Sequence, residues 1–327
     1  MAKIYDCFPF FNELELLEMR LRLHAPVVDH FVISESTHTF MGAPKPLHFL
    51  ENRHRFAEWE DKIIYIQVDD FPETTDPFVR EYHQRNSLLK VAANAADDDM
   101  FIISDLDELL RPELILEASN FDGFITFNMP MFVFYINLQE SEDGWGPCYA
   151  TRKKYLMNIE NVSTARWDRS QIDHDLGPRG KILNLHKAGW HFTHLGGIER
   201  LKAKFQAYSH ANDKWPQAMM HENALEQHII SGGIIGNFKE SSRFIPIDYP
   251  TFPLIIQDNQ SYYKEIGFIK DVYEALSELQ DLYKDVRHKY ASLCKDDVRA
   301  HAALSWVTPR EFAALSDINL DNISLFK

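Results

Sequence analysis

Cysteine is scarce in this chain: among 327 residues there are three, Cys7, Cys148 and Cys294. Their number and spacing exclude a disulfide framework and a zinc site made of cysteines, so we expect a reducing compartment. Long apolar runs are missing too. The longest covers about residues 129–136, whereas a membrane-spanning helix needs about 18 or more apolar residues. Because Lys3 precedes any apolar run, we expect no signal peptide and predict a soluble, cytoplasmic protein without a membrane-spanning segment.

Basic residues are outnumbered, since 34 Lys and Arg stand against 49 Asp and Glu and leave a net charge of −15. Neutralising a phosphate backbone requires clustered cations, so this balance argues against nucleic acid as a partner. Hydrophobic residues make up 45% of the chain and charged residues 25%, which is typical of a globular protein. We find no repeat and no low-complexity stretch.

Short apolar runs alternate with helical patterns in the first half of the chain. The runs predict strands at Ile4–Phe8, Val27–Ser34, Lys62–Val68 and Met100–Ser104. Helices are predicted between them, over residues 12–25, 51–60 and 78–96. Strands that are apolar nearly throughout and separated by helices indicate a parallel sheet covered on both faces. The sequence therefore predicts an α/β, doubly wound architecture of the nucleotide-binding type.

The pattern changes after Asp107. Longer strands are expected at Gly123–Leu138, Pro147–Leu156 and Ala188–Leu195, and helices at residues 198–208 and 223–231. From about Pro253 onward the pattern is almost entirely helical. We therefore expect a main domain over residues 1–252 and a helical C-terminal extension, packed on it, over residues 253–327.

The most informative stretch is residues 101–108, in which a buried strand ends and Asp105 and Asp107 follow. In extended backbone these two side chains point to the same side, and Leu106 turns into the core. Carboxylates so close repel each other, and a divalent cation relieves that repulsion. Oxygen ligands suit Mg²⁺ or Mn²⁺, and ligands bind beyond the carboxyl ends of parallel strands in this architecture. The pair therefore predicts a metal site.

Two other Asp-x-Asp patterns, at residues 97–99 and 173–175, do not directly follow a buried strand. The structural alternative for the main pair is that Asp107 or Glu108 lies near the N-terminus of a helix that begins at Pro112. On the strand that contains His191 and His194, residues three apart face opposite sides. At most one of these two histidines is therefore expected at the metal.

Three further side chains are candidates for contacts with a nucleotide. Arg85, on the helix before the acidic pair, is placed to approach a diphosphate or to hold Asp105. Glu35 ends the second predicted strand, where it would accept hydrogen bonds from a ribose or a base, and Arg53 is a candidate of the same kind. For each of them an exposed or solvated side chain is the commoner explanation.

Five segments of the chain together resemble glycosyltransferase family 17. In order, they are Tyr5–Leu17, Phe31–Ser36, Gln84–Asn86, Ser104–Glu108 and Ala188–His191. They span roughly residues 5–235. The resemblance implies a GT-A fold, which is a Rossmann-like mixed sheet with helices on both faces, and transfer of a sugar from a nucleotide donor with inversion.

The same resemblance implies roles for single residues. Asp105 and Asp107 would hold Mn²⁺ or Mg²⁺ on the donor diphosphate, and His191 would supply a further ligand to that metal. The candidates for binding the nucleotide sugar are Glu35, Arg53, Arg85, Asp105 and Trp190. The donor is expected to be a UDP-sugar, with UDP-N-acetylglucosamine a family-level expectation, and the acceptor a glycan or glycoconjugate.

One-step inversion requires a carboxylate base that takes the proton of the acceptor hydroxyl. The candidates are Asp143, Glu222, Glu108 and Asp175, and the sequence does not choose among them. Asp143 ranks slightly first because it stands beside Gly144–Gly146, a loop suited to stacking an acceptor sugar. Trp145 and Trp190 are candidate sugar platforms, and core packing explains them equally well.

Two functions of other classes compete with transfer. A metal-dependent phosphohydrolase would use Asp105 as nucleophile and Asp107 as acid, but the commonest motif of that kind follows the first strand. A non-catalytic carbohydrate-binding protein would use exposed aromatic rings. It would bind glycans regardless of metal and nucleotide, whereas a transferase would bind its nucleotide donor together with a metal.

Overall fold

The computed structural model describes residues 2–168, 181–213, 216, 243–247 and 252–270. The chain divides into two compact units. The first comprises residues 1–131, 141–193 and 206–211, and the second comprises residues 132–140, 194–205 and 212–327. Within the predicted C-terminal extension, the described part contains helices α11 (Leu254–Asp258) and α12 (Gln260–Glu265). The boundary at residue 252 stays a prediction.

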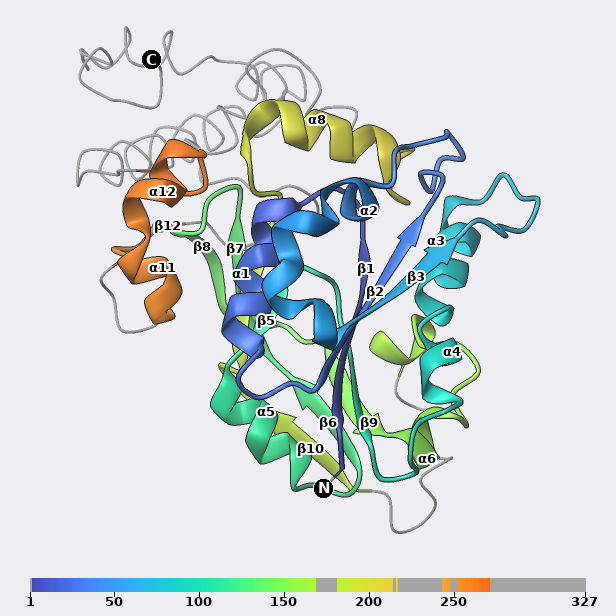
Figure 1. Ribbon diagram of the computed structural model, residues 1–327. Coiled ribbons are helices and arrows are strands. Elements are labelled where there is room, and N and C mark those ends of the chain that lie inside the picture. Colours follow the sequence, from blue (N-terminus) through green and yellow to red (C-terminus); the bar gives the residue numbers. More distant parts are fainter. Residues whose placement is uncertain (1, 169–180, 214–215, 217–242, 248–251, 271–327) are drawn as a thin grey trace, which may run out of the picture. The chain divides into compact units, whose positions relative to one another are not determined.

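A seven-stranded sheet forms the centre of the first unit (Figure 1). Its strands are β1 (Ile4–Phe10), β2 (His30–Ser36), β3 (Ile63–Val68), β4 (Met100–Ile103), β6 (Phe124–Phe127), β9 (Tyr149–Arg152) and β10 (Ile182–Leu185). They lie in the order β10-β6-β9-β4-β1-β2-β3. The neighbours β4, β1, β2 and β3 pair in parallel, whereas β9 is antiparallel to both β4 and β6. The prediction of an α/β fold with a mixed sheet is confirmed.

The helices of the first unit are short. Those in its described residues are α1 (Leu14–His24), α2 (His48–Asn52), the 3₁₀ helix η1 (Arg53–Lys62), α3 (Pro77–Asn86), α4 (Leu89–Ala92), α5 (Pro112–Ser119), α6 (Lys153–Leu156) and the 3₁₀ helix η2 (Thr164–Arg166). The helix predicted over residues 78–96 is two helices, α3 and α4; between them the backbone bonds span three residues instead of four, as from the Leu88 N–H to the Arg85 carbonyl at 3.2 Å. In the described part of the chain, no helix combines the length and apolarity that a bilayer crossing requires.

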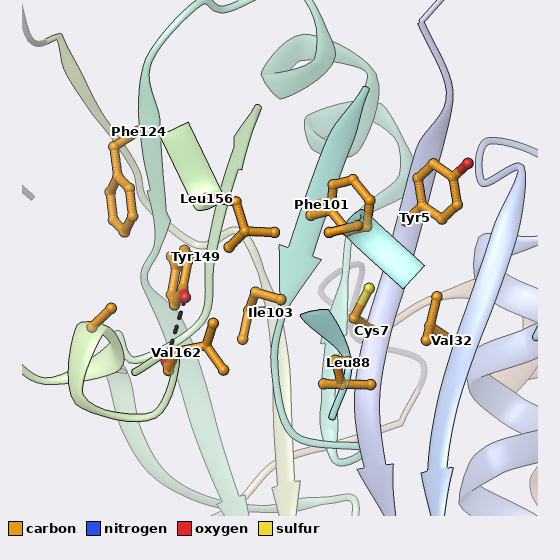
Figure 2. Close-up of a cluster of buried hydrophobic side chains, with 12 residues drawn as sticks. Tyr5, Cys7, Val32, Leu88, Phe101, Ile103, Phe124, Tyr149, Leu156 and Val162 are labelled. Atoms are coloured by element: carbon orange, nitrogen blue, oxygen red, sulfur yellow. Dashed lines mark hydrogen bonds between the residues drawn. The ribbon is translucent and has the colours of Figure 1, made fainter. Parts of the chain in front are cut away.

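The two faces of the sheet are covered by different helices. On one face, Tyr5 and Cys7 join a buried apolar cluster with Leu88, Leu156 and other side chains from β2, β4, β6, β9, α4 and α6 (Figure 2). Asp6 points to the opposite face because successive residues of a strand alternate. There it meets Arg20 of α1. Helices therefore lie on both faces, as predicted.

A second sheet has the strand order β12-β8-β7-β11-β5. Its strands are β5 (Glu108–Leu110), β7 (Met129–Val133), β8 (Leu138–Trp145), β11 (Gly189–Thr193) and β12 (Arg243–Phe244). The prediction of a single long strand over residues 123–138 is wrong, because this segment forms the two strands β6 and β7. The strand breaks at Asn128, whose N–H donates to the Leu185 carbonyl at 2.8 Å, and ends at Phe134, which has a left-handed φ of 67°.

Candidate active site

The acidic pair lies on a tight turn that joins β4 to β5. The Glu108 N–H donates to the Asp105 carbonyl at 3.1 Å, and the Asp105 N–H donates to Glu108 Oε2 at 2.8 Å. The prediction of extended backbone through the pair is therefore wrong, although Leu106 is buried as expected. Helix α5 does begin at Pro112, as the structural alternative expected, but strand β5 separates it from the turn and no side chain caps its N-terminus, so the capping role for Asp107 or Glu108 is wrong. The turn gives the two aspartates different surroundings.

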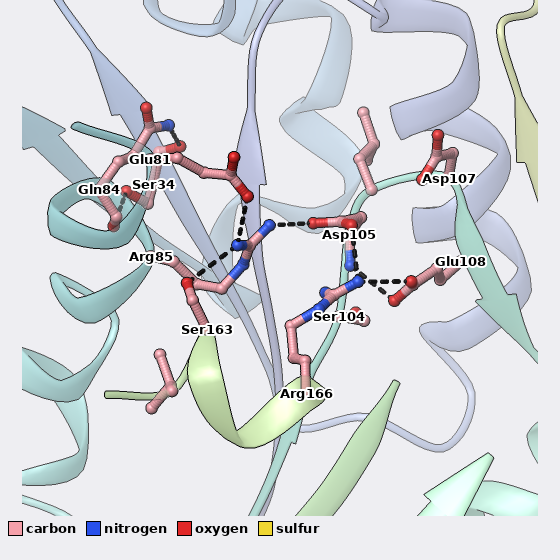
Figure 3. A network of polar contacts seen from close by, with 12 residues as sticks. Ser34, Glu81, Gln84, Arg85, Ser104, Asp105, Asp107, Glu108, Ser163 and Arg166 are labelled. Carbon is pink, nitrogen blue, oxygen red and sulfur yellow. Dashed lines mark hydrogen bonds and ion pairs between the residues drawn. The ribbon is translucent and has the colours of Figure 1, made fainter. Parts of the chain in front are cut away.

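Asp105 is held between two buried arginines (Figure 3). Its Oδ1 accepts a hydrogen bond from Arg85 of α3, and its Oδ2 accepts one from Arg166 of η2 at 2.7 Å. Arg85 is itself fixed by Glu81 at 2.8 Å and by the Ser163 hydroxyl at 3.0 Å. Of the two roles predicted for Arg85, the structure shows the one in which it holds Asp105.

These arginines keep Asp105 ionised. Burial raises the pKa of Asp105, but the guanidinium groups of Arg166 and then Arg85 outweigh burial, so the pKa lies below its ordinary value. Asp107 acts in the opposite direction, because its negative charge raises the pKa of Asp105. The two aspartates of the turn are therefore close enough to repel each other.

Glu108 is completely buried beneath this turn. Its Oε1 accepts hydrogen bonds from Trp145 Nε1 at 2.6 Å and from Arg166 at 2.7 Å, while its Oε2 accepts the Asp105 N–H. Burial raises the pKa of Glu108 above its ordinary value, even though Arg166 lowers it. With three donors on its carboxylate and no exposed surface, Glu108 is placed to support the turn.

Arg20 of helix α1 donates hydrogen bonds to the backbone of the same turn. It ion-pairs with Asp6, with Nε 2.9 Å from Oδ2, and its Nη1 donates to the carbonyls of Asp105, Leu106 and Glu108 at 2.7, 3.1 and 2.9 Å. His24 Nδ1 lies 2.8 Å from the same Asp6 carboxylate. Burial alone raises the pKa of Asp6, but Arg20 and His24 hold it well below its usual range. A buried ion pair thus fixes the backbone that presents the aspartates.

Asp107 faces strand β11. Its Oδ1 lies 3.5 Å from Nε2 of His191, and its carbonyl accepts the Phe192 N–H at 2.8 Å. Strand β11 runs antiparallel to β5 with His191 opposite Glu108. Gly189 allows this pairing, since a Cβ there would lie 1.9 Å from the Leu109 carbonyl oxygen. The Gly-Trp-His segment therefore has a physical role, which is to bring a histidine beside the second aspartate.

Trp145 closes this side of the site. Its ring stacks on the His191 ring with centroids 4.2 Å apart and planes at 19°, while its indole N–H reaches Glu108. His194, in contrast, belongs to the second unit and packs against Phe134 and Phe205. The structure thus brings His191 to the aspartates of the turn.

Asp107 and His191 fit two positions in the coordination shell of a divalent cation. Two cis ligands at about 2.1 Å from one cation lie about 3 Å apart, close to the observed 3.5 Å. Five carboxylates and three guanidinium groups lie at the turn or in ion pairs around it. If all of them are ionised, negative charge is in excess. The groups are Asp6, Glu81, Asp105, Asp107, Glu108, Arg20, Arg85 and Arg166. Within the described residues, no three His, Cys, Asp or Glu gather into a complete metal site. Mg²⁺ sites commonly complete their coordination with waters and with the phosphate oxygens of a substrate.

Three predicted nucleotide contacts lie in other surroundings. Glu35 is fully buried and accepts hydrogen bonds from the Phe49 N–H at 3.1 Å and the Tyr65 hydroxyl at 3.0 Å. Arg53 pairs with Glu60 on η1 at the surface. Trp190 is buried on the side of β11 opposite to His191, with the Arg111 guanidinium 4.4 Å above its ring. Arg53 at the surface and Trp190 in the core match their structural alternatives, whereas the solvated position expected for Glu35 is wrong because its carboxylate is buried and hydrogen-bonded.

Among the base candidates, Asp143 is described and partly open, with 27% of its side chain exposed. It lies on β8 two residues before Trp145, hence on the same face of that strand. Its carboxylate is 2.5 Å from Nδ1 of His186 and accepts the Lys187 N–H at 3.1 Å. Glu222 and Asp175 lie outside the described residues.

Sequence reasoning missed Arg166 and Arg20. A signal for Arg20 exists, because Asp6 is a charge in an otherwise apolar buried strand and a buried carboxylate requires a cationic or hydrogen-bonding partner. The adjacent amphipathic helix offers Arg20. Arg166 carries no such signal, since it lies in an irregular segment about 60 residues after the turn and only the fold brings the two together.

Comparison with known proteins gives a consistent result. The family model for glycosyltransferase family 17 matches residues 1–257. The human protein named β-1,4-mannosyl-glycoprotein 4-β-N-acetylglucosaminyltransferase is 31% identical over 245 residues, 68% of this chain and 45% of that protein. The rat protein of the same name is 31% identical over 55% of this chain and 38% of its own length. The chain therefore spans less than half the length of these relatives.

Among solved structures, the galactosyltransferase LgtC in complex with donor and acceptor sugar analogues is 11% identical. The alignment covers 85% of this chain and 100% of that chain with a TM-score of 0.29, which is too low to carry the assignment. The family model, in contrast, spans every residue of the acidic turn and of the β11 segment described above. The chain therefore belongs to glycosyltransferase family 17, as the order of its five segments predicted.

Proposed function

We propose that the protein is an inverting, metal-dependent glycosyltransferase that moves N-acetylglucosamine from a UDP donor to a hydroxyl of a glycan. Family membership supports the reaction class, and the printed names of the human and rat relatives support the sugar and a mannose-containing acceptor. The observation that carries the proposal is the acidic turn, in which Asp107 lies beside His191 while two arginines hold Asp105.

We assign Asp107 and His191 as the protein ligands of Mn²⁺ or Mg²⁺. When bound, such a cation would offset the negative charge that develops on the departing diphosphate. Asp105 has both side-chain oxygens engaged by arginine, so its role in this proposal is to fix Arg85 and Arg166 beside the donor. Trp145, stacked on His191, keeps the imidazole in place and covers one of its faces.

The acceptor hydroxyl must lose a proton as it attacks the anomeric carbon from the face opposite the diphosphate. We assign this step to Asp143, because Glu108 is enclosed by three donors, whereas the carboxylate of Asp143 is partly open. His186, against the Asp143 carboxylate, would take up or share the proton. The cytoplasmic location expected from the sequence remains part of the proposal.

A panel of nucleotide sugars tests the proposal. The protein is incubated with UDP-N-acetylglucosamine, UDP-glucose, UDP-galactose or GDP-mannose, each with Mn²⁺, with Mg²⁺ or with EDTA. We expect slow hydrolysis of UDP-N-acetylglucosamine with a metal only, and transfer to mannose-terminated oligosaccharides with a β-linkage in the NMR spectrum of the product. Binding of glycans without any response to nucleotide or metal would favour the carbohydrate-binding alternative instead.

A further inference from the structure

An exposed tryptophan stands next to the proposed active site. Trp167 follows Arg166 directly and has 68% of its surface exposed, more than any other aromatic side chain in the described part of the chain. A single exposed apolar side chain is common on protein surfaces, so what this ring signifies depends on the residues next to it. Nothing in the proposed chemistry of the acidic turn accounts for this ring.

A continuous series of aromatic rings links Trp167 to the turn. The Trp167 ring meets the Trp145 ring edge to face, with centroids 5.5 Å apart and planes at 88°. Trp145 in turn stacks on His191, which lies beside Asp107. These contacts connect the outermost ring to the side chains assigned to the metal.

Hydrogen bonds also fix the backbone at Trp167. The preceding residue, Arg166, is buried and bonded to both Asp105 and Glu108 at 2.7 Å. The Trp167 N–H donates to the Thr164 carbonyl at 3.0 Å, which closes the turn of η2. The backbone that carries the ring is therefore ordered before any ligand binds.

We infer that Trp167 is the platform on which the acceptor sugar stacks, an inference that rests on the proposed function. The C–H groups on one face of a hexopyranose pack favourably on the electron-rich face of an indole. The donor sugar must be enclosed, because water would otherwise hydrolyse it, whereas a glycan acceptor leaves most of its surface in solvent. A ring that is two-thirds exposed therefore suits the acceptor and not the donor.

The test compares Trp167→Ala and Trp167→Phe with the wild type and with Leu116→Ala, which removes an exposed apolar side chain on α5. The acceptor probes are oligosaccharides that end in β-1,4-linked mannose. Trp167→Ala is expected to raise the acceptor KM about tenfold, the effect of about 1.4 kcal/mol, with an unchanged donor KM and unchanged donor hydrolysis without acceptor. Trp167→Phe should recover most of the loss, and Leu116→Ala should match the wild type.

An acceptor KM within about twofold of the wild type in Trp167→Ala, or a raised donor KM, would overturn the inference. Failure of the proposed function looks different, because the wild type itself would then neither hydrolyse nor transfer the donor sugar. If the wild type hydrolyses the donor but leaves the mannosides unused, the same variants are compared on an immobilised glycan panel. Binding that is absent, or equal in wild type and Trp167→Ala, then counts against the platform.

Discussion

One nitrogen of Arg166, Nη2, lies 2.7 Å from both Asp105 Oδ2 and Glu108 Oε1. A single guanidinium therefore ties the first aspartate of the turn to the strand that follows it. Replacing Arg166 by Met is expected to lower the free energy of unfolding by about 3–5 kcal/mol, because buried negative charge is left without its partner. Urea unfolding at pH 7 measures the loss.

The control for this change is Arg53→Met, which breaks a surface pair with Glu60. Exposed pairs contribute little, so the control is expected to lose less than about 1 kcal/mol. Equal losses in the two variants would show that Arg166 does not hold the turn.

Gly189 is expected to tolerate no side chain. In Gly189→Ala the new Cβ would lie 1.9 Å from the backbone oxygen of Leu109, so strands β11 and β5 must separate and His191 must move from Asp107. We expect a loss of stability of more than about 3 kcal/mol, and loss of metal-dependent UDP binding. Thermal unfolding and calorimetry with UDP check the two effects.

Gly146→Ala is the matched comparison. Its Cβ would lie 2.3 Å from Oδ1 of Asn128, the end of a side chain that is able to rotate away. Gly146→Ala should therefore lose less stability than Gly189→Ala. Gly189→Ala with wild-type stability and UDP binding would contradict the role given to the close strand pairing.

The buried carboxylate of Asp6 is expected to make the free energy of unfolding depend on pH. Its pKa is held well below the ordinary value by Arg20 and His24 against the effect of burial, so ionised Asp6 contributes stability above about pH 4. That contribution is lost as the pH falls through the lowered pKa. The stability gap between wild type and Asp6→Asn should be constant from pH 7 to 5 and should shrink below about pH 4.

Urea unfolding at each pH measures this gap. The control is Asp97→Asn, which changes an exposed aspartate and should differ from the wild type in stability by almost nothing. A gap that widens on acidification would mean that Asp6 is protonated in the folded protein. The buried pair with Arg20 would then not be ionic.

Asp143 is expected to act in catalysis without holding the donor. Asp143→Asn should lower kcat for transfer by about 10²–10⁴-fold, because it removes the carboxylate that takes the acceptor proton. Metal-dependent UDP binding should stay unchanged in calorimetry. The comparison is Asp122→Asn, an exposed aspartate paired with Lys154. A kcat within about threefold of the wild type would place the base elsewhere, among candidates such as Glu222.

The approximate positions of the first four strands along the chain were predictable because buried parallel strands are apolar and short, as in Val32 and its neighbours on β2. The acidic turn was found for the same reason, since Asp105 ends such a strand. Its conformation was not predictable. The turn depends on Arg20 and Arg166, which reach it from residues about 85 positions before and about 60 positions after, and local sequence carries no record of such contacts.

The surroundings of Trp145 and Trp190 could not be predicted from the local sequence either. Both were equal candidates for a sugar platform, since tryptophan serves in cores and at binding sites alike. One lies against His191, and the other is buried under Arg111 on the opposite side of β11. The exposed ring of Trp167 was not singled out, because exposure is a property of the folded chain.

The central claim is that Asp107 holds a divalent cation on the nucleotide donor. Isothermal titration of UDP into wild type, Asp107→Asn and the surface variant Asp97→Asn, each with Mn²⁺ and with EDTA, tests it most directly. We predict that wild type and Asp97→Asn bind UDP with Mn²⁺ and at least about tenfold more weakly with EDTA, while Asp107→Asn binds equally weakly in both. UDP binding by Asp107→Asn that equals the wild type and still requires Mn²⁺ would contradict the claim.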